Sequence, residues 1–291
     1  MSAIKVKNIT KNYGNICALD NISLTFESNK IYGLLGRNGA GKTTLLNLIT
    51  NRLFPTEGEI TIDDDSVIEN DSAIEKVFYM AEKNLYEESY LVKKVFKWTK
   101  EFYPDFDMDY ALSLCDKFGL KANKKFKSLS TGYNSITKLI ITLSSNAKVL
   151  IFDEPILGLD ACHRELFYKE LLDNFIKKPK TIIISTHIIE EISDILERVV
   201  VINKGKIALD DNVEKILEKA WCVSGAAKNI DEFVKSRNCI NVEQMGAFKS
   251  ATIMGEVTEL DEKEAKDLEL EFSKVELQKL FIHLTKGGMN K

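Results

Sequence analysis

Residues 36–44 read Gly-Arg-Asn-Gly-Ala-Gly-Lys-Thr-Thr (GRNGAGKTT), and an apolar run stands on each side, IYGLL at 31–35 and LLNLIT at 45–50. Three glycines in six residues let a loop curl without Cβ clashes, so that its backbone N–H groups point inward. The flanking patterns predict a strand before the loop and a helix that begins at Lys42. A helix N-terminus adds a positive dipole end, so this corner is suited to an anion. The simpler alternative is a glycine-rich turn.

The spacing of the stretch Gly36–Thr43 is GxxxxGK[ST], in the strand–loop–helix context that this phosphate-binding motif requires. Lys42 would bring a full charge to the β- and γ-phosphates of a nucleotide, and the Thr43 hydroxyl can ligate Mg²⁺. The predicted nucleotide contacts here are Gly36, Arg37, Asn38, Gly39, Ala40, Gly41, Lys42, Thr43 and Thr44.

A second motif, KVLIFDEP at 148–155, places two carboxylates at the end of an apolar strand. Asp153 would hold Mg²⁺ through water, and Glu154 would polarise the attacking water as a general base. The alternative is a strand that ends in a capped turn, with Pro155 as the stop. Its pairing with the phosphate motif favours a site that hydrolyses a nucleotide phosphate over this alternative.

Short apolar strands alternate with helical patterns along the chain, which predicts an α/β fold with a mostly parallel sheet covered on both faces. We expect a P-loop NTPase (RecA-like) core, an N-terminal antiparallel β subdomain and an inserted α-helical subdomain at about 86–147. The pattern changes near residue 219. The prediction is therefore a nucleotide-binding domain at 1–218 and a small C-terminal α+β domain at 219–291.

Composition sets the broad class of protein. The 291 residues are 44% hydrophobic and 29% charged with a net charge of −4, so no basic face for nucleic acid is indicated. The N-terminus is polar and lacks a hydrophobic signal region, and the longest apolar runs have the length of strands. Five scattered cysteines without a CxxC pair indicate reduced thiols.

Around these two motifs, residues 3–217 resemble the ATP-binding cassette (ABC) ATPases and keep the order of that family's motifs. The resemblance places Tyr13 against adenine, and Ser130 and Gly132 of LSTGY (129–133) at the γ-phosphate of ATP bound to another subunit. It places Asp160 of LGLD (157–160) at the dimer seam. His187, at the end of an apolar strand, would contact the γ-phosphate and the attacking water.

Two positions depart from the family pattern. The signature reads LSTGY instead of LSGGQ, and Glu82 stands where the family has glutamine. A carboxylate there could ligate the metal, directly or through water, but changes the local charge. Both variants resemble the bacitracin-exporter-like and Ytr-type cassette ATPases of Gram-positive bacteria.

The resemblance implies ATP and Mg²⁺ as ligands, and a second nucleotide-binding domain that closes head-to-tail in a homodimer or heterodimer. It also implies a separate membrane permease, which would hold the chain at the inner face of the cell membrane. Export of a drug, an antimicrobial peptide or an envelope-related substrate is the favoured function. Two others stay open: a soluble cassette ATPase that acts on ribosomes or nucleic acid, and a module that uses ATP only to dimerise.

Overall fold

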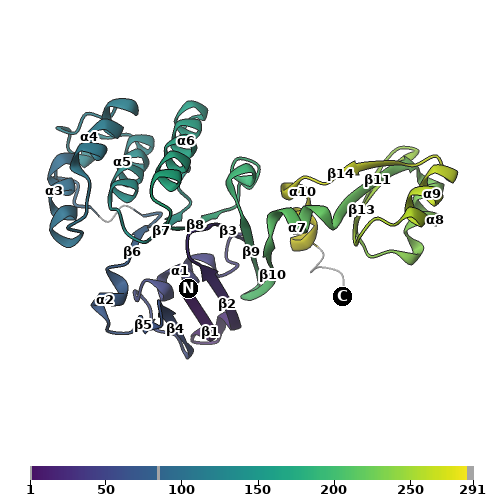
Figure 1. Cartoon of the computed structure of the whole chain (residues 1–291), viewed down its shortest axis with the longest axis horizontal. Coiled ribbons are helices and arrows are strands. Elements are labelled where there is room, and N and C mark those ends of the chain that lie inside the picture. The colour runs from purple at the N-terminus through teal and green to yellow at the C-terminus, as the bar shows by residue number, and fades with distance from the viewer. Residues whose placement is uncertain (1, 84–85, 287–291) are drawn as a thin grey trace. The chain divides into compact units, whose positions relative to one another are not determined.

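The computed structural model describes residues 2–83 and 86–286 (Figure 1). By their contacts the residues form two compact units, Met1–His187 with Ile202–Ile207, and Ile188–Val201 with Ala208–Lys291. The domain boundary expected between residues 218 and 219 stays a prediction. Each unit is described below by itself.

The first unit opens with an antiparallel sheet in the order β2-β1-β4-β5. Its strands are β1 (Ser2–Tyr13), β2 (Ile16–Glu27), β4 (Glu57–Ile62) and β5 (Asp65–Ser66), and the short helix α2 (Asp71–Ile74) follows them. In β2, burial alternates along Ile22, Leu24 and Phe26, as expected for a strand with one face in the core. This is the antiparallel subdomain that the period-2 pattern predicts.

A six-stranded sheet, ordered β10-β9-β3-β8-β7-β6, forms the core. Its strands are β3 (Ile31–Leu35), β6 (Val77–Met80), β7 (Val149–Asp153), β8 (Thr181–Thr186), β9 (Arg198–Asn203) and β10 (Lys206–Asn212). Every residue of β3, β7 and β8 is buried, which explains their continuous apolar runs. The pairs β3–β8, β7–β8 and β6–β7 are parallel, and helices α1 (Lys42–Ile49) and α6 (Ala161–Lys177) follow β3 and β7. The predicted P-loop NTPase core is confirmed.

Three helices lie side by side in the middle of the chain: α3 (Val92–Phe102), α4 (Met108–Lys117) and α5 (Thr131–Ser144), with the 3₁₀ turn Phe126–Ser128 before α5 (Figure 1). Side-chain oxygens cap two of them, since Asp107 accepts from the Tyr110 N–H and Ser130 from the Tyr133 N–H. The helical insertion that the sequence predicts is therefore present.

Lys180, just before β8, is a buried cation in the first unit. Its side chain is 4% exposed, and its Nζ has no hydrogen-bond partner among the described residues. Burial, reinforced by Lys178, lowers the pKa of Lys180 to about 8.

We expect Lys180→Met to stabilise the protein at pH 7 by about 1–3 kcal/mol, because methionine fills the same space without a buried charge. Since the unfolded chain binds this proton up to about pH 10 and the folded chain only up to about pH 8, the parent should gain stability as pH rises between these values. Thermal unfolding of parent and variant at pH 7 and pH 9.5 measures both effects. If the difference in stability between variant and parent is as large at pH 9.5 as at pH 7, the pKa of Lys180 is not lowered in the folded protein.

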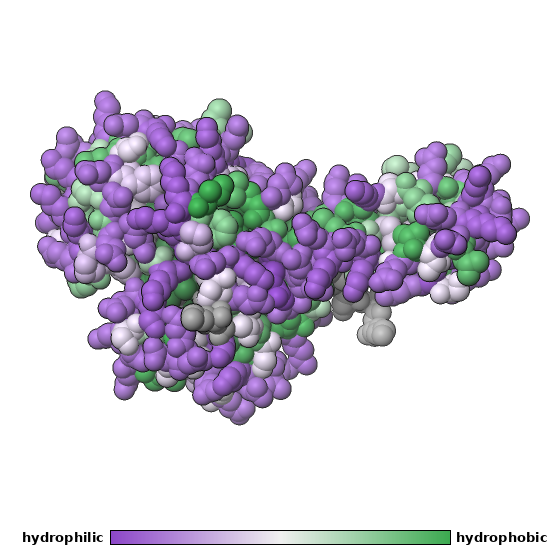
Figure 2. Space-filling view, viewed as in Figure 1, coloured by the Kyte–Doolittle hydropathy of each residue, from purple (hydrophilic) through white to green (hydrophobic). Residues whose placement is uncertain are grey.

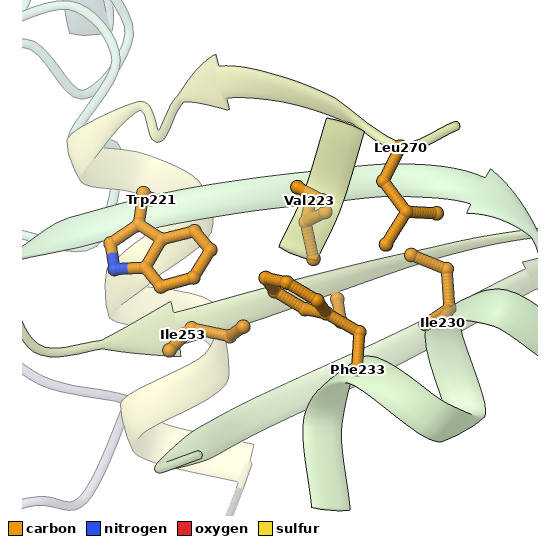
Figure 3. Close-up of a cluster of buried hydrophobic side chains, with 8 residues drawn as sticks. Trp221, Val223, Ile230, Phe233, Ile253 and Leu270 are labelled. Carbon is orange, nitrogen blue, oxygen red and sulfur yellow. The ribbon is translucent and has the colours of Figure 1, made fainter. Parts of the chain in front are cut away.

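The second unit contains α7 (Val213–Glu218) and the 3₁₀ turn Ser193–Ile195, followed by strands and helices in the order β-α-β-β-α-β. These are β11 (Ala220–Ala226), α8 (Ala227–Phe233), β12 (Cys239–Met245), β13 (Phe248–Met254), α9 (Glu259–Asp267) and β14 (Glu271–Lys274), with α10 (Leu277–Lys286) after them. A further 3₁₀ turn, Val234–Ser236, follows α8. The sheet is antiparallel in the order β12-β13-β11-β14. Trp221, Val223, Phe233 and Ile253 belong to its buried cluster (Figure 3). This is the small α+β fold expected at the C-terminal end.

The helices of residues 2–83 and 86–286 include none long and apolar enough to cross a membrane. Hydrophilic residues cover most of the face shown in Figure 2.

Candidate functional site

Three strand ends position the site. In the parallel register, Leu35 at the end of β3 pairs with Thr186 at the end of β8, and Asp153 at the end of β7 pairs with Ser185. The loop at 36–41, the carboxylates at the end of β7 and His187 after β8 therefore lie at one edge of the sheet. The loop meets the two later motifs, which are more than 100 residues from it, because carboxyl ends of parallel strands share an edge.

The loop at 36–41 ends at a glycine that no other residue could replace without strain. Gly41 has φ +113°, and a Cβ there would lie 2.8 Å from the Ala18 carbonyl oxygen. Helix α1 begins directly after it at Lys42, as predicted, so its first N–H groups face the loop. Lys42 is 7% exposed, and its Nζ donates to the Gly36 carbonyl at 2.7 Å. Burial lowers the pKa of Lys42, although the charges of Glu154, Asp153 and Glu82 act in the opposite direction.

Asp153 is the most buried acid of the site, with 1% of its surface exposed. Its Oδ2 accepts hydrogen bonds from the Thr43 hydroxyl at 3.0 Å and from the Tyr79 hydroxyl at 3.1 Å. Its Oδ1 is buried and has no hydrogen-bond partner among the described residues. Hard oxygen donors with an unsatisfied carboxylate oxygen suit Mg²⁺, so Thr43 and Asp153 fit this ion together with nucleotide oxygens. Among the described residues no group of three or more His, Cys, Asp or Glu side chains could hold a metal by itself.

Glu154 and His187 form a contact in the same cleft. His187 Nδ1 lies 2.9 Å from Glu154 Oε2, and the other Glu154 oxygen lies 4.0 Å from Lys42 Nζ. The Glu154 side chain is 13% exposed and that of His187 is 44% exposed. Glu154 has φ +50°, an uncommon conformation for a non-glycine residue. Its N–H donates to the Ser185 carbonyl, which holds this turn against β8.

These residues surround one cleft of about 560 Å³. Its lining residues are Ala18, Arg37, Asn38, Gly39, Ala40, Gly41, Lys42, Thr43, Thr44, Glu82, Glu154, Leu157 and His187. Glu82 therefore lies at the cleft. Backbone N–H groups, one ammonium and two carboxylates around a nucleotide-sized cavity could bind phosphates and activate a water beside them.

Six of the expected site residues do not line this cleft, and two of them, Gly36 and Asp153, lie beside it through their hydrogen bonds with Lys42 and Thr43. Tyr13 is 45% exposed at the end of β1. Ser130 and Asp160 cap the N-termini of α5 and α6. Gly132 lies against the 157–160 loop, where a Cβ would approach the Gly158 carbonyl oxygen to 2.8 Å. The LSTGY and LGLD segments therefore contact each other within one chain.

Two side chains near the site were missed in the sequence analysis. Tyr79, on β6, bonds to Asp153. Lys138, on α5, is 9% exposed and donates to the carbonyls of Ala81 and Glu82 at 3.0 and 2.6 Å, which anchors the backbone at Glu82. The available signals were a polar group within an apolar stretch, Tyr79 in the run VFYM and Lys138 in the segment 131–144. Neither pattern indicates which residue the side chain contacts.

Known proteins resemble this chain in sequence and in fold. A family model described as ABC transporter matches residues 19–157. The chain is 26% identical over 251 residues to the ABC transporter ATP-binding protein YtrB of Bacillus subtilis, covering 86% of each chain. It is 32% identical over 222 residues to the uncharacterized ABC transporter ATP-binding protein MJ1023 of Methanocaldococcus jannaschii, covering 74% of this chain and 80% of that one.

A solved structure of similar fold is the dimeric post-hydrolysis state of the ATP-binding cassette MJ0796 bound to ADP and Pi. It matches with a TM-score of 0.64 and 25% identity, over 72% of this chain and 98% of that one.

Proposed function

This chain belongs to the ABC transporter family of ATP-binding proteins, and from that membership we propose that it hydrolyses ATP to energise a separate membrane permease, in the direction of export. The observation that carries the proposal is the cleft in which Lys42, Thr43, Glu154 and His187 converge, with Asp153 buried directly behind Thr43. A polyphosphate would engage the loop at 36–44 directly and the carboxylates through a bound cation or water.

Each side chain has a distinct role in the proposed reaction. Lys42 and the loop N–H groups hold the β- and γ-phosphates, and the Lys42 ammonium stabilises the charge that develops on the γ-phosphoryl group. Glu154 accepts a proton from the attacking water, while His187 holds the Glu154 carboxylate from its far side. Mg²⁺, held by Thr43 and Asp153, would neutralise phosphate charge when it is bound.

The cleft of one chain is incomplete in this proposal. Ser130, Gly132 and Asp160 do not line it, and they are held in another part of the same unit by α5 and α6. A second nucleotide-binding domain, arranged head-to-tail, would supply these groups to the γ-phosphate, and closure of the pair would drive the permease. Tyr13 would pack on the adenine ring, and Glu82 would lie beside the metal.

The direction of transport and the substrate rest on resemblance. One relative is a bacitracin transport ATP-binding protein of Enterococcus faecalis, 29% identical over 223 residues. Another is a tungstate uptake protein of Peptoclostridium acidaminophilum, 30% identical over 213 residues. The LSTGY signature favours the exporter group, so we propose a drug, an antimicrobial peptide or an envelope-related substrate. Residence at the inner face of the cell membrane, through the permease, follows from this proposal.

Purification of the tagged chain from native membranes in mild detergent tests the transport function. We expect a stoichiometric polytopic membrane protein, identified by mass spectrometry, and ATP hydrolysis by the complex. The Glu154→Gln variant is the matched control, because it should recover the same partner without hydrolysis. Recovery only in the soluble fraction, with ribosomes, DNA or no partner, would overturn the transport function in favour of a soluble cassette ATPase or a dimerisation module.

A further inference from the structure

We propose that Tyr79 is a positioning residue for Asp153, and that Arg52 holds the Tyr79 ring in place for this role. The inference rests on the proposed function, since it assigns Asp153 to the metal that accompanies ATP. The two Asp153 oxygens differ in their hydrogen bonds. Oδ2 accepts two hydroxyl donors, whereas the buried Oδ1 accepts none from the described residues.

Two donors on one oxygen fix the rotation of a carboxylate about its Cβ–Cγ bond. With Oδ2 held by Thr43 and Tyr79, Oδ1 keeps a constant direction and its lone pairs stay free for a water or a cation. Loss of a hydrogen bond of this kind to a ligating carboxylate typically weakens metal binding by about 10–100-fold.

The two hydroxyls are not equivalent. Thr43 is itself expected to ligate the metal, so its hydroxyl oxygen would have to coordinate the ion as well as donate to Asp153 when the site is filled. Tyr79 has no such second task and can donate to Asp153 whether or not a nucleotide is bound. Tyr79 is therefore the donor that can still hold Asp153 in position once the metal engages Thr43.

Arg52 limits the movement of the Tyr79 ring. Its guanidinium carbon lies 4.8 Å from the ring centroid, within the range of a cation–π contact. The backbone is fixed as well, because Tyr79 pairs with Ile151 in the parallel register of β6 and β7, two residues before Asp153. Ring and strand together determine where the hydroxyl lies.

Tyr79 and Arg52 also line a second cleft of about 250 Å³. Tyr103 lines the same cleft, and its hydroxyl donates to the Val77 carbonyl at 2.8 Å. Tyr103 thus resembles Tyr79 in residue type, cleft and hydrogen bonding, but its hydroxyl partner is a backbone carbonyl. It provides a matched control.

The test is Mn²⁺ binding, followed by electron paramagnetic resonance, to the full-length protein with a non-hydrolysable ATP analogue. We expect Tyr79→Phe to weaken Mn²⁺ binding about 10-fold, because it keeps the ring and removes only the donor. Binding of the analogue in EDTA should stay within twofold of the parent. Tyr103→Phe should leave Mn²⁺ affinity unchanged.

A second variant separates positioning from general damage to the cleft. Arg52→Gln should weaken Mn²⁺ binding in the parent by a smaller factor than Tyr79→Phe. It should have no further effect in the Tyr79→Phe background, because the hydroxyl through which Arg52 acts is then missing. If the double variant instead loses Mn²⁺ affinity by the product of the two single losses, Arg52 acts independently of Tyr79.

Unchanged Mn²⁺ affinity in Tyr79→Phe, or an equal loss in Tyr103→Phe, would overturn the positioning role. Failure of the parent itself to bind the analogue would instead overturn the proposed function. The two outcomes are therefore distinguishable in one set of titrations.

Discussion

Replacing Glu154 by glutamine is expected to lower ATP hydrolysis by about 10²–10⁴-fold, the range for loss of a general base, while ATP still binds. Glutamine has nearly the same shape, but its amide cannot accept a proton from the attacking water. The Glu154 carboxylate is mostly buried and contacts His187 at 2.9 Å, so its position in the cleft is fixed before ATP binds.

The same substitution should make ATP binding tighter, because it removes a negative charge from a cleft that receives a polyphosphate. Phosphate release measures the first effect, and light scattering with ATP measures the accumulation of closed dimers. Glu75→Gln, an exposed residue after α2, is the control and should behave as the parent. Hydrolysis by Glu154→Gln at the parental rate would mean that another group is the base.

Replacing Lys42 by glutamine should weaken ATP binding by about 10–100-fold, the usual scale for a charge-assisted hydrogen bond in a desolvated site. The ammonium is 7% exposed and donates to the Gly36 carbonyl, so it is held over the loop before any ligand arrives. Burial disfavours the charge of Lys42, and the phosphates of ATP would offset that cost.

Titration with a fluorescent ATP analogue measures this loss. Lys97→Gln, which removes an exposed charge from α3, should bind the analogue as the parent does. The two variants also differ in kind, since Glu154→Gln binds ATP without cleaving it, whereas Lys42→Gln binds it poorly. Retention of parental affinity in Lys42→Gln would contradict the assignment of the loop to phosphate.

Much of the fold was predictable because its signals are local. The period-2 alternation in β2 and the apolar runs in β3, β7 and β8 reflect burial of one face or of both faces. The start of α1 at Lys42 was also predictable, because the glycine-rich motif ends at Gly41 and the apolar pattern of a helix follows it directly. The insertion of α3–α5 followed from apolar periodicity in the same way.

The contacts of the site depended on register between distant strands, which no local pattern contains. Thr43 and Asp153 are 110 residues apart in the sequence, and Tyr79 and Asp153 are 74 residues apart. The motif spacing indicated that Thr43 and Asp153 share a site. It did not indicate that a third residue, Tyr79, donates to the same oxygen.

The sequence by itself determined the motifs from which the function is proposed: a glycine-rich loop at 36–44, an acid pair at 153–154, and a histidine after the next buried strand. These follow from glycine sterics, strand endings and residue type, which act over a few neighbouring residues. Tertiary structure alone decided that Asp153 has one oxygen bonded and one without a partner among the described residues, that His187 contacts Glu154, and that Ser130 and Asp160 lie outside the cleft. The physical reason is that side chains meet only where the packing of whole strands and helices brings them together.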